Sequence, residues 1–280
     1  MNPIKPQTGF VAFFDILGYK QIILNNDIHK TAQIVSDTLV NIPEIIIRNV
    51  LRASAGSTQA EPGQAVEVDS WQRTLTQIDW LIFSDSILVS LPVDPTLPLS
   101  ETLQAYAAFA TVCATLLNKS FAAGFPLRGA ISVGEFFIEE RCFAGRPIIN
   151  AYRTAQELEF CGCILDEDAN SFVSQLRKDV VSAGDINMLT MLDQTTILYI
   201  VPMKEDTSER HRTINWVSLE VEGFPRFEGS IRDYVTTAFL KHNKIALPGV
   251  QNKINNTEMF VRHVLTNLDI KPWSMTAQAG

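Results

Sequence analysis

Residues 10–19 read Phe-Val-Ala-Phe-Phe-Asp-Ile-Leu-Gly-Tyr. The run is apolar up to Asp15 and ends at Gly18, which predicts a buried strand that closes on a carboxylate and then turns. Residues 80–89 read Trp-Leu-Ile-Phe-Ser-Asp-Ser-Ile-Leu-Val, and Asp85 is the one acid in that run. An ionised Asp among buried aliphatic side chains is costly unless it is paired, hydrogen-bonded or bound to a metal. The two acids therefore predict a shared ligand, and a divalent cation is the simplest one.

The composition is that of a well-packed globular protein. The chain has 280 residues, of which 46% are hydrophobic and 19% charged. Its formal net charge of -8 argues against a general nucleic-acid binder, although a small anionic substrate needs only a local cluster of cations or a metal. The four cysteines form no CxxC pair, so no structural zinc site is expected. The absence of a signal peptide and of a long apolar run favours a cytoplasmic protein without a membrane span.

The pattern of apolar residues predicts an α+β fold. Strands are expected at about 8–16, 74–83, 86–91, 126–137 (turning near Gly134), 161–165 and 196–201. Helices are expected at about 28–51 (interrupted at Pro43), 99–122, 148–160, 168–181, 229–243 and 252–268, and residues 53–70 read as a mobile loop. This order predicts a mixed or antiparallel sheet with helices on one face, related to the ferredoxin-like arrangement. We expect a core over residues 1–185 and a C-terminal α/β extension over residues 186–280.

Asp15 and Asp85 are the strongest candidates for a chemical role. Mg²⁺ and Mn²⁺ bind through one or two carboxylates together with substrate phosphates and water, and Ile16 can add a main-chain carbonyl. Each acid alone has an ordinary alternative, because Asp15 can cap a helix and Asp85 can occupy a turn. The shared apolar context of the two acids favours the metal.

Two arginines have structural alternatives that the residues alone favour. Arg128 lies within the predicted strand 126–137, where a structural pairing with a carboxylate is the expected role. Arg153 lies on the helix that begins near residue 147 and can reach phosphate oxygens in a cleft. A solvated arginine paired with Glu157 four residues later is the competing interpretation.

Other candidates are weaker. Trp80 can stack on a base and Tyr19 can approach a substrate, but packing is the favoured role for both side chains. The main-chain N–H groups of Leu17, Gly18 and Tyr19 can cradle phosphate at a helix start. The basic cluster at residues 241–244 is expected to close its own helix by pairing with the helix dipole.

Four segments resemble motifs of the class III nucleotidyl cyclases, and they occur in the family's order over roughly residues 10–160. Residues 14–19 resemble the first metal motif and residues 83–86 the second; residues 127–134 are similar to the family's Arg-x-Gly-Ile-x-x-Gly strand, and residues 145–153 to its Asn-x-Ala-x-Arg segment, with Ala151 and Arg153 in step. The resemblance implies a class III cyclase core with two Mn²⁺ or Mg²⁺ ions at Asp15, Ile16 and Asp85. It also implies a homodimer with shared active sites, in which Arg153 of one chain stabilises charge on the α-phosphate bound to the other.

The departures from the family pattern concern the base. The base-selecting Lys of purine cyclases falls on Leu81, and their base-selecting Asp falls on Cys142. Their transition-state Asn falls on Ile149, with Asn150 next to it as the remaining candidate for the ribose contact.

The whole pattern is most similar to the bacterial pyrimidine cyclases of the Pycsar antiphage systems, which make cyclic UMP or cyclic CMP. This resemblance implies conversion of UTP to 3′,5′-cyclic UMP and pyrophosphate, with CTP as the alternative substrate. The product would act on a separate effector protein.

Two other classes of function stay open. A catalytically inactive cyclase-like domain used for dimerisation or nucleotide sensing fits the displaced Asn but not the two retained acids. A diguanylate-type cyclase or polymerase on a similar sheet would carry a Gly-Gly-(Asp/Glu)-Glu-Phe hairpin, which residues 134–137 match only faintly and in another strand.

Overall fold

The computed structural model describes residues 6–56, 65–139, 142–218 and 230–267. Its core has four strands in the order β2-β3-β1-β4, with each neighbouring pair antiparallel. Their bounds are β1 (Gln7–Ile16), β2 (Asp79–Phe83), β3 (Ser86–Pro92) and β4 (Leu127–Glu139). Helices α1 (Tyr19–Leu24), α2 (Ile28–Val35), α3 (Ile42–Gly56) and α4 (Ala65–Thr76), with a π-helical turn (Ser36–Val40), connect β1 to β2; α5 (Leu99–Ala123) connects β3 to β4. This β-α-β-β-α-β order is ferredoxin-like and confirms the predicted α+β class.

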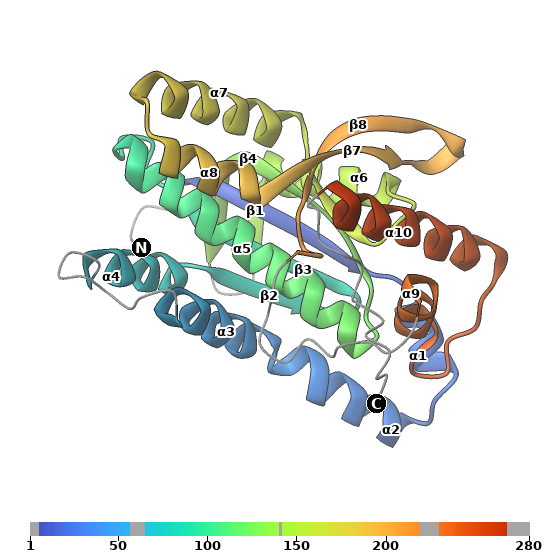
Figure 1. The fold of residues 1–280 in the computed structure, drawn as a ribbon. Coiled ribbons are helices and arrows are strands. Elements are labelled where there is room, and N and C mark those ends of the chain that lie inside the picture. Colours follow the sequence, from blue (N-terminus) through green and yellow to red (C-terminus); the bar gives the residue numbers. More distant parts are fainter. Residues whose placement is uncertain (1–5, 57–64, 140–141, 219–229, 268–280) are drawn as a thin grey trace, which may run out of the picture.

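The remaining elements widen the same sheet. β4 pairs in parallel with β6 (Gly162–Leu165), and the sheet continues through β8 (Ser208–Ile214) to β7 (Thr196–Pro202). The outer half of β4 also pairs with β5 (Cys142–Gly145). The later helices are α6 (Arg146–Glu157), α7 (Glu167–Ala183), α8 (Ile186–Thr195), α9 (Ile231–Leu240) and α10 (Pro248–Asn267), and a 3-10 turn spans Lys204–Asp206. In Figure 1, α9 and α10 lie at one end of the molecule, beside α1.

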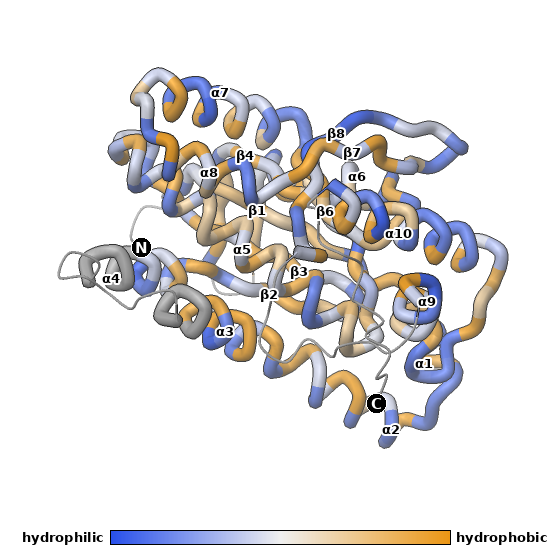
Figure 2. Tube along the Cα trace, in the orientation of Figure 1, coloured by the Kyte–Doolittle hydropathy of each residue, from blue (hydrophilic) through white to orange (hydrophobic). Residues whose placement is uncertain are grey.

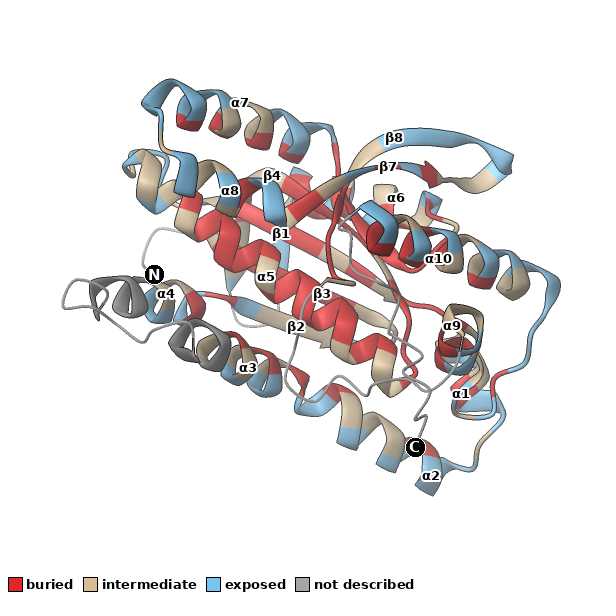
Figure 3. Cartoon of the chain, viewed as in Figure 1, coloured by how far each residue is buried: buried red, intermediate tan, exposed pale blue. Residues whose placement is uncertain are grey.

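The two faces of the sheet are covered differently. Phe10, Ala12 and Phe14 of β1 point into the main core, against α5, which is buried along most of its length (Figure 3). Val11, on the opposite face, belongs to a second apolar cluster that includes Ile148 of α6. The helix α5 thus covers one face and the short helix α6 covers part of the other, so the helices are not confined to a single face as predicted.

The structure corrects three element predictions. The segment expected to be a loop is helical up to residue 56 and again from residue 65, whereas residues 57–64 lie outside the described ranges. Trp71 and Leu75, four residues apart, both pack against the core from α4, so β2 begins at Asp79 rather than near residue 74. No turn occurs at Gly134, because β4 stays paired there with Gly9 of β1 and continues to Glu139.

No helix within the described ranges is long and apolar enough to cross a membrane.

Candidate active site

Asp15 and Asp85 lie at the same corner of the sheet. Asp15 is next to the last residue of β1, opposite Ser86 of β3. Asp85 occupies the two-residue turn between β2 and β3, where the preceding Ser84 takes a left-handed φ of 55°. The main-chain N–H of Ile16 donates to the carbonyl oxygen of Asp85 at 2.8 Å. The structure therefore brings together the three residues predicted to hold the metal.

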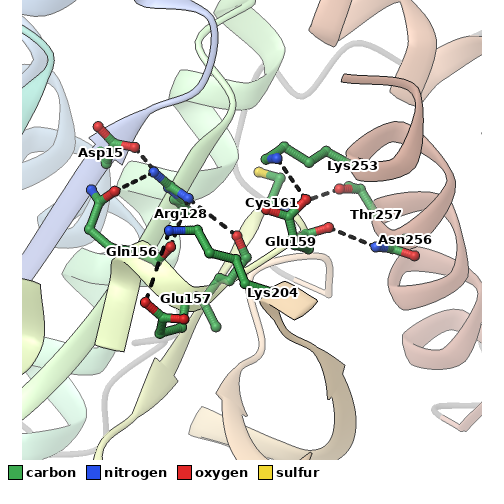
Figure 4. Close-up of polar contacts among 11 residues, drawn as sticks. Asp15, Arg128, Gln156, Glu157, Glu159, Cys161, Lys204, Lys253, Asn256 and Thr257 are labelled. Carbon is green, nitrogen blue, oxygen red and sulfur yellow. Dashed lines mark hydrogen bonds and ion pairs between the residues drawn. The ribbon is translucent and has the colours of Figure 1, made fainter. Parts of the chain in front are cut away.

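Asp15 is already engaged by an arginine. Nε of Arg128 donates to Oδ2 of Asp15 at 2.7 Å, and the two side chains are only 12% and 15% exposed. The same guanidinium donates to Oε1 of Gln156 at 2.6 Å and to the carbonyl oxygens of Gln156 (3.1 Å) and Leu158 (3.4 Å). Figure 4 shows Arg128 between the end of β1 and the end of α6. The structural role expected for Arg128 is present, and its partner is the predicted metal ligand.

Tyr19 lies close to the second acid. Burial raises the pKa of the Tyr19 phenol, and the negative charge of Asp85 raises it further. The phenol therefore keeps its proton at neutral pH and can act as a hydrogen-bond donor at this corner.

The turn at residues 17–19 supplies fewer amides than its sequence predicts. The N–H of Leu17 donates to the carbonyl oxygen of Pro126 at 2.9 Å and is therefore unavailable to a phosphate. Gly18 has a left-handed φ of 81° and leads directly into α1. Gly18 and Tyr19 thus provide the amides of this turn that can meet a ligand.

The residues predicted to contact the α-phosphate (Arg153) and the ribose (Asn150) lie on α6. Arg153 is exposed, and neither an ion pair nor a hydrogen bond joins its side chain to other described residues. Its expected partner, Glu157, lies 3.9 Å from Nζ of Lys204 instead. Asn150 donates through Nδ2 to Oδ2 of Asp168 on α7 at 3.2 Å. Within the described part of one chain, no hydrogen bond or ion pair joins Arg153 or Asn150 to Asp15 or Asp85.

The candidate base-binding residues fall on different faces of β2. Trp80 packs against the main core, on the α5 face, and its indole nitrogen finds no hydrogen-bond partner among the described residues. Leu81, next in the strand, packs against the second cluster on the opposite face. Trp80, Leu81 and Phe143 are all among the residues that line a cavity of about 50 Å³, with the exposed Cys142 beside Phe143 in β5. Alternation along the strand places the side chains of Trp80 and Leu81 on opposite faces of β2, but both residues border this cavity.

A second cavity contains none of these residues. It measures about 950 Å³ and lies at the other end of β1, where Gln7, Arg73 and Glu101 are among its lining residues. A cavity volume alone indicates no reaction. Asp15 and Asp85, at the opposite end of β1, remain the better candidate site.

The donor set at the corner fits a hard divalent cation. The carboxylates of Asp15 and Asp85 and the carbonyl oxygen of Ile16 are all oxygen donors, which Mg²⁺ and Mn²⁺ prefer. Among the described residues no three His, Cys, Asp or Glu side chains gather around one point. An ion held here would therefore complete its coordination with water and with substrate oxygens.

Comparisons with known proteins give a weak likeness of fold. No protein-family model matches the chain, and no curated protein matches it. Among solved structures, the chain is similar to the adenylyl cyclase CyaB from P. aeruginosa, with 12% identity, a TM-score of 0.44, and coverage of 79% of this chain and 100% of that chain. It is also similar to the guanylyl cyclase Cya2, with 12% identity, a TM-score of 0.37, and coverage of 75% and 92%. Likeness at this level does not transfer an activity.

Proposed function

We propose that this protein is a nucleotide cyclase that converts UTP, in preference to CTP, into the 3′,5′-cyclic monophosphate and pyrophosphate. The observation that supports this most directly is the meeting of Asp15 and Asp85 at one corner of a ferredoxin-like core, joined by the hydrogen bond from Ile16 to Asp85. The two acids come from strands about 70 residues apart in the sequence, and their proximity is what an ion bound between them requires.

In the proposed reaction the 3′-oxygen forms a bond to the α-phosphorus, and the bond from that phosphorus to the bridging oxygen of the β-phosphate breaks. The proton of the 3′-hydroxyl passes to solvent and pyrophosphate leaves. Asp15, Asp85 and Ile16 would hold two Mg²⁺ or Mn²⁺ ions, which when bound acidify the hydroxyl and neutralise the leaving group. The chain itself contributes positioning and electrostatic stabilisation, and the protonated Tyr19 is a donor within reach of this corner.

Arg128 is expected to change partners when substrate binds. In the structure its guanidinium compensates the charge of Asp15. Cations at Asp15 would repel it, and a triphosphate would offer it new oxygen acceptors in bidentate geometry. We infer that Arg128 exchanges part of its contact with Asp15 for a phosphate contact when substrate binds.

The proposed assembly is a homodimer with shared active sites. α6 exposes Ile149 (56%) and Tyr152 (48%) beside Arg153, and large apolar side chains at a surface commonly mark an interface. A second copy covering this face would place its own Arg153 toward the acids of the first. Such a dimer would give Arg153 a partner, whereas no hydrogen bond or ion pair holds its side chain within the described part of one chain.

The pyrimidine preference is supported by Leu81. The apolar side chain of Leu81 stands where purine cyclases carry a base-selecting Lys, and it offers no hydrogen bond to a purine edge. By the resemblance to the Pycsar cyclases, the product would be a messenger in antiphage defence, made in the cytoplasm and sensed by a separate effector protein, with residues 186–280 as an extension of the catalytic core.

A second candidate function is a catalytically inactive nucleotide-binding domain. The engagement of Asp15 by Arg128 and of Asn150 by Asp168 favours it, because both side chains are then occupied within the fold.

One experiment separates these alternatives. The protein is incubated with each of the four ribonucleoside triphosphates and Mn²⁺, and products are identified by mass. Cyclic UMP or cyclic CMP is the expected product, and Asp85→Asn serves as the inactive control. Cyclic AMP or cyclic GMP as the sole product would refute the base preference. Nucleotide binding without turnover of any of the four would establish the inactive domain.

A further inference from the structure

The loop between α9 and α10 closes the C-terminal end of a distant helix. Helix ends leave carbonyl groups without intrahelical partners, and cations there are favoured by the helix dipole. Three side chains of this loop reach three successive carbonyl oxygens at the end of α5: Lys241 Nζ to Ala122 (3.3 Å), His242 Nε2 to Ala123 (2.7 Å) and Lys244 Nζ to Gly124 (2.7 Å). The basic cluster thus closes α5, rather than only its own helix as its sequence predicts.

The same loop also forms hydrogen bonds with α1 and with the residues that follow it. The contacts are Asn25 Nδ2 to the carbonyl of Asn243 (2.7 Å), Asn26 Nδ2 to the carbonyl of His242 (3.0 Å), Asn243 Nδ2 to Oδ1 of Asn26 (2.9 Å) and the N–H of Ile245 to Oε1 of Gln21 (2.7 Å). Residues 241–245, which we call the latch, therefore join α1 to the end of α5. In Figure 1, α9 and α1 lie next to one another at this end of the molecule.

Lys244 reaches the turn that follows Asp15. Its side chain is buried, with 6% exposure, and a Cβ built at Gly18 would lie 2.9 Å from Cδ of Lys244. Gly18 is thus required both by its left-handed φ and by the close approach of the lysine stem. A change in the position of Lys244 would therefore alter the packing against Gly18, which lies two residues from Ile16 and next to Tyr19.

The latch is held in a costly conformation. His242 and Asn243 are consecutive non-glycine residues with left-handed φ values of 64° and 62°. Lys244 is buried, and no carboxylate pairs with its Nζ within the described ranges; its partners are the carbonyl oxygens of Gly124 and Ala238. Strain and a buried cation persist only where the surrounding contacts impose them, and such sites point to a functional constraint.

We propose that the latch sets the position of the turn at residues 17–19, and that Lys244 is the positioning residue of this device. Its catalytic consequence rests on the proposed function, because the turn connects Asp15 and Ile16 to Tyr19. Lys244 touches neither the reacting atoms nor the ions in this proposal; it acts through Gly18.

The test compares Lys244→Met with the wild-type full chain by hydrogen–deuterium exchange. Met keeps most of the stem but loses the donors to Gly124 and Ala238. The amides of Gln21 and Ile22, which bond the carbonyl oxygen of Gly18, should exchange about tenfold faster, whereas those of β3 and β4 should not change. Arg262→Met, which removes an exposed cation on α10 paired with Glu258, is the matched control and should leave α1 unaffected.

A second, less disruptive variant keeps the proposal testable if Lys244→Met fails to fold. Asn243→Gly tolerates the left-handed backbone but loses the contact with Asn26, so it should accelerate exchange in α1 by a smaller factor. Unchanged hydrogen exchange in α1 for both variants would refute the proposal that the latch positions the turn at residues 17–19.

Turnover is measured on the same samples. A fall in kcat for Lys244→Met of about tenfold, larger than any change in KM, supports positioning. Faster exchange in α1 with a wild-type protein that cyclises no nucleotide would support the latch and refute the proposed function. Wild-type turnover in Lys244→Met despite faster exchange would refute the catalytic consequence.

Discussion

The carboxylate of Asp15 is paired with Arg128, whereas no such ion pair holds Asp85 among the described residues. We therefore expect Asp15→Asn and Asp85→Asn to differ in stability although both should lose turnover. Asp15→Asn removes the charge that compensates a largely buried guanidinium and should lower the free energy of unfolding by about 1–3 kcal/mol. Asp85→Asn should change it by no more than about 0.5 kcal/mol. Urea denaturation and product assays measure both quantities, and turnover in either variant would refute the metal assignment.

Arg153→Ala should lower turnover without changing stability, unlike Asp15→Asn. Its exposed side chain has no ion pair or hydrogen bond within the described ranges, so Arg153→Ala should leave the free energy of unfolding unchanged within about 0.5 kcal/mol. If the guanidinium stabilises charge in the transition state, kcat should fall by about 100-fold while KM changes little. Arg262→Ala, another exposed arginine, is the control. An equal kcat for Arg153→Ala and wild type would show that the motif register is wrong.

At the scale of single residues, the sequence predicts the residues that stand out from an apolar strand. Asp15 and Asp85 stand out because each interrupts an apolar run, and the structure brings them to one corner. The bond from Asn150 to Asp168 could not be foreseen, because it depends on how α6 meets α7. Strand alternation predicts that the side chains of Trp80 and Leu81 point to opposite faces of β2, as the structure has them.

At the scale of elements, strong apolar periodicity gave reliable predictions and polar segments did not. β1 and α5 lie close to their predicted bounds because their side chains are buried. β8 (Ser208–Ile214) was not predicted, since it is hydrophilic along most of its length (Figure 2) and is held by main-chain pairing with β7. The basic cluster of the latch was assigned to its own helix because sequence proximity cannot reveal that the end of α5 is its partner.

The latch also predicts a dependence of stability on pH. Burial lowers the pKa of Lys244 to about 7, against about 10.4 in an unfolded chain. Below pH 7 both states carry the proton, and the cost of burying the charge is fully present. Between pH 7 and about 10 the unfolded state still binds the proton that the folded state has released, so stability rises with pH.

Lys244→Met removes this titration. The stability of the wild type relative to the variant should therefore rise from pH 7 to pH 9.5, measured by urea denaturation at each pH. His242, whose pKa burial lowers, and the buried thiol of Cys161, whose pKa burial raises, are present in both proteins. The charge of Lys244 is only a lesser cause of each shift, so their contribution to the difference should be smaller than that of Lys244 itself. A difference that stays constant over this range would show that Lys244 keeps an ordinary pKa.

At the scale of the whole molecule, the C-terminal residues are part of the core's support. Phe121 of α5 packs against Trp216, Tyr234 and Phe239, with ring centroids 5.0, 5.1 and 6.3 Å apart. Lys253 and Asn256 of α10 bond Glu159, one residue beyond the Leu158 carbonyl that accepts from Arg128 (Figure 4). C-terminal residues therefore support the candidate site through the latch and through α10.

Shared active sites make a quantitative prediction for mixed dimers. If Asp15 and Arg153 of each site come from different chains, a dimer of one Asp15→Asn chain and one Arg153→Ala chain has one site with both defects and one site with none. Random exchange of equal amounts makes half of the dimers mixed, so the mixture should regain about a quarter of the wild-type turnover.

The matched control combines Arg153→Ala with a chain that carries both substitutions. Every site in that mixture contains at least one defect, so turnover should stay at the level of the separate variants. Native mass spectrometry of differently tagged chains verifies that mixed dimers have formed. If verified mixed dimers regain no turnover, Asp15 and Arg153 act within one chain.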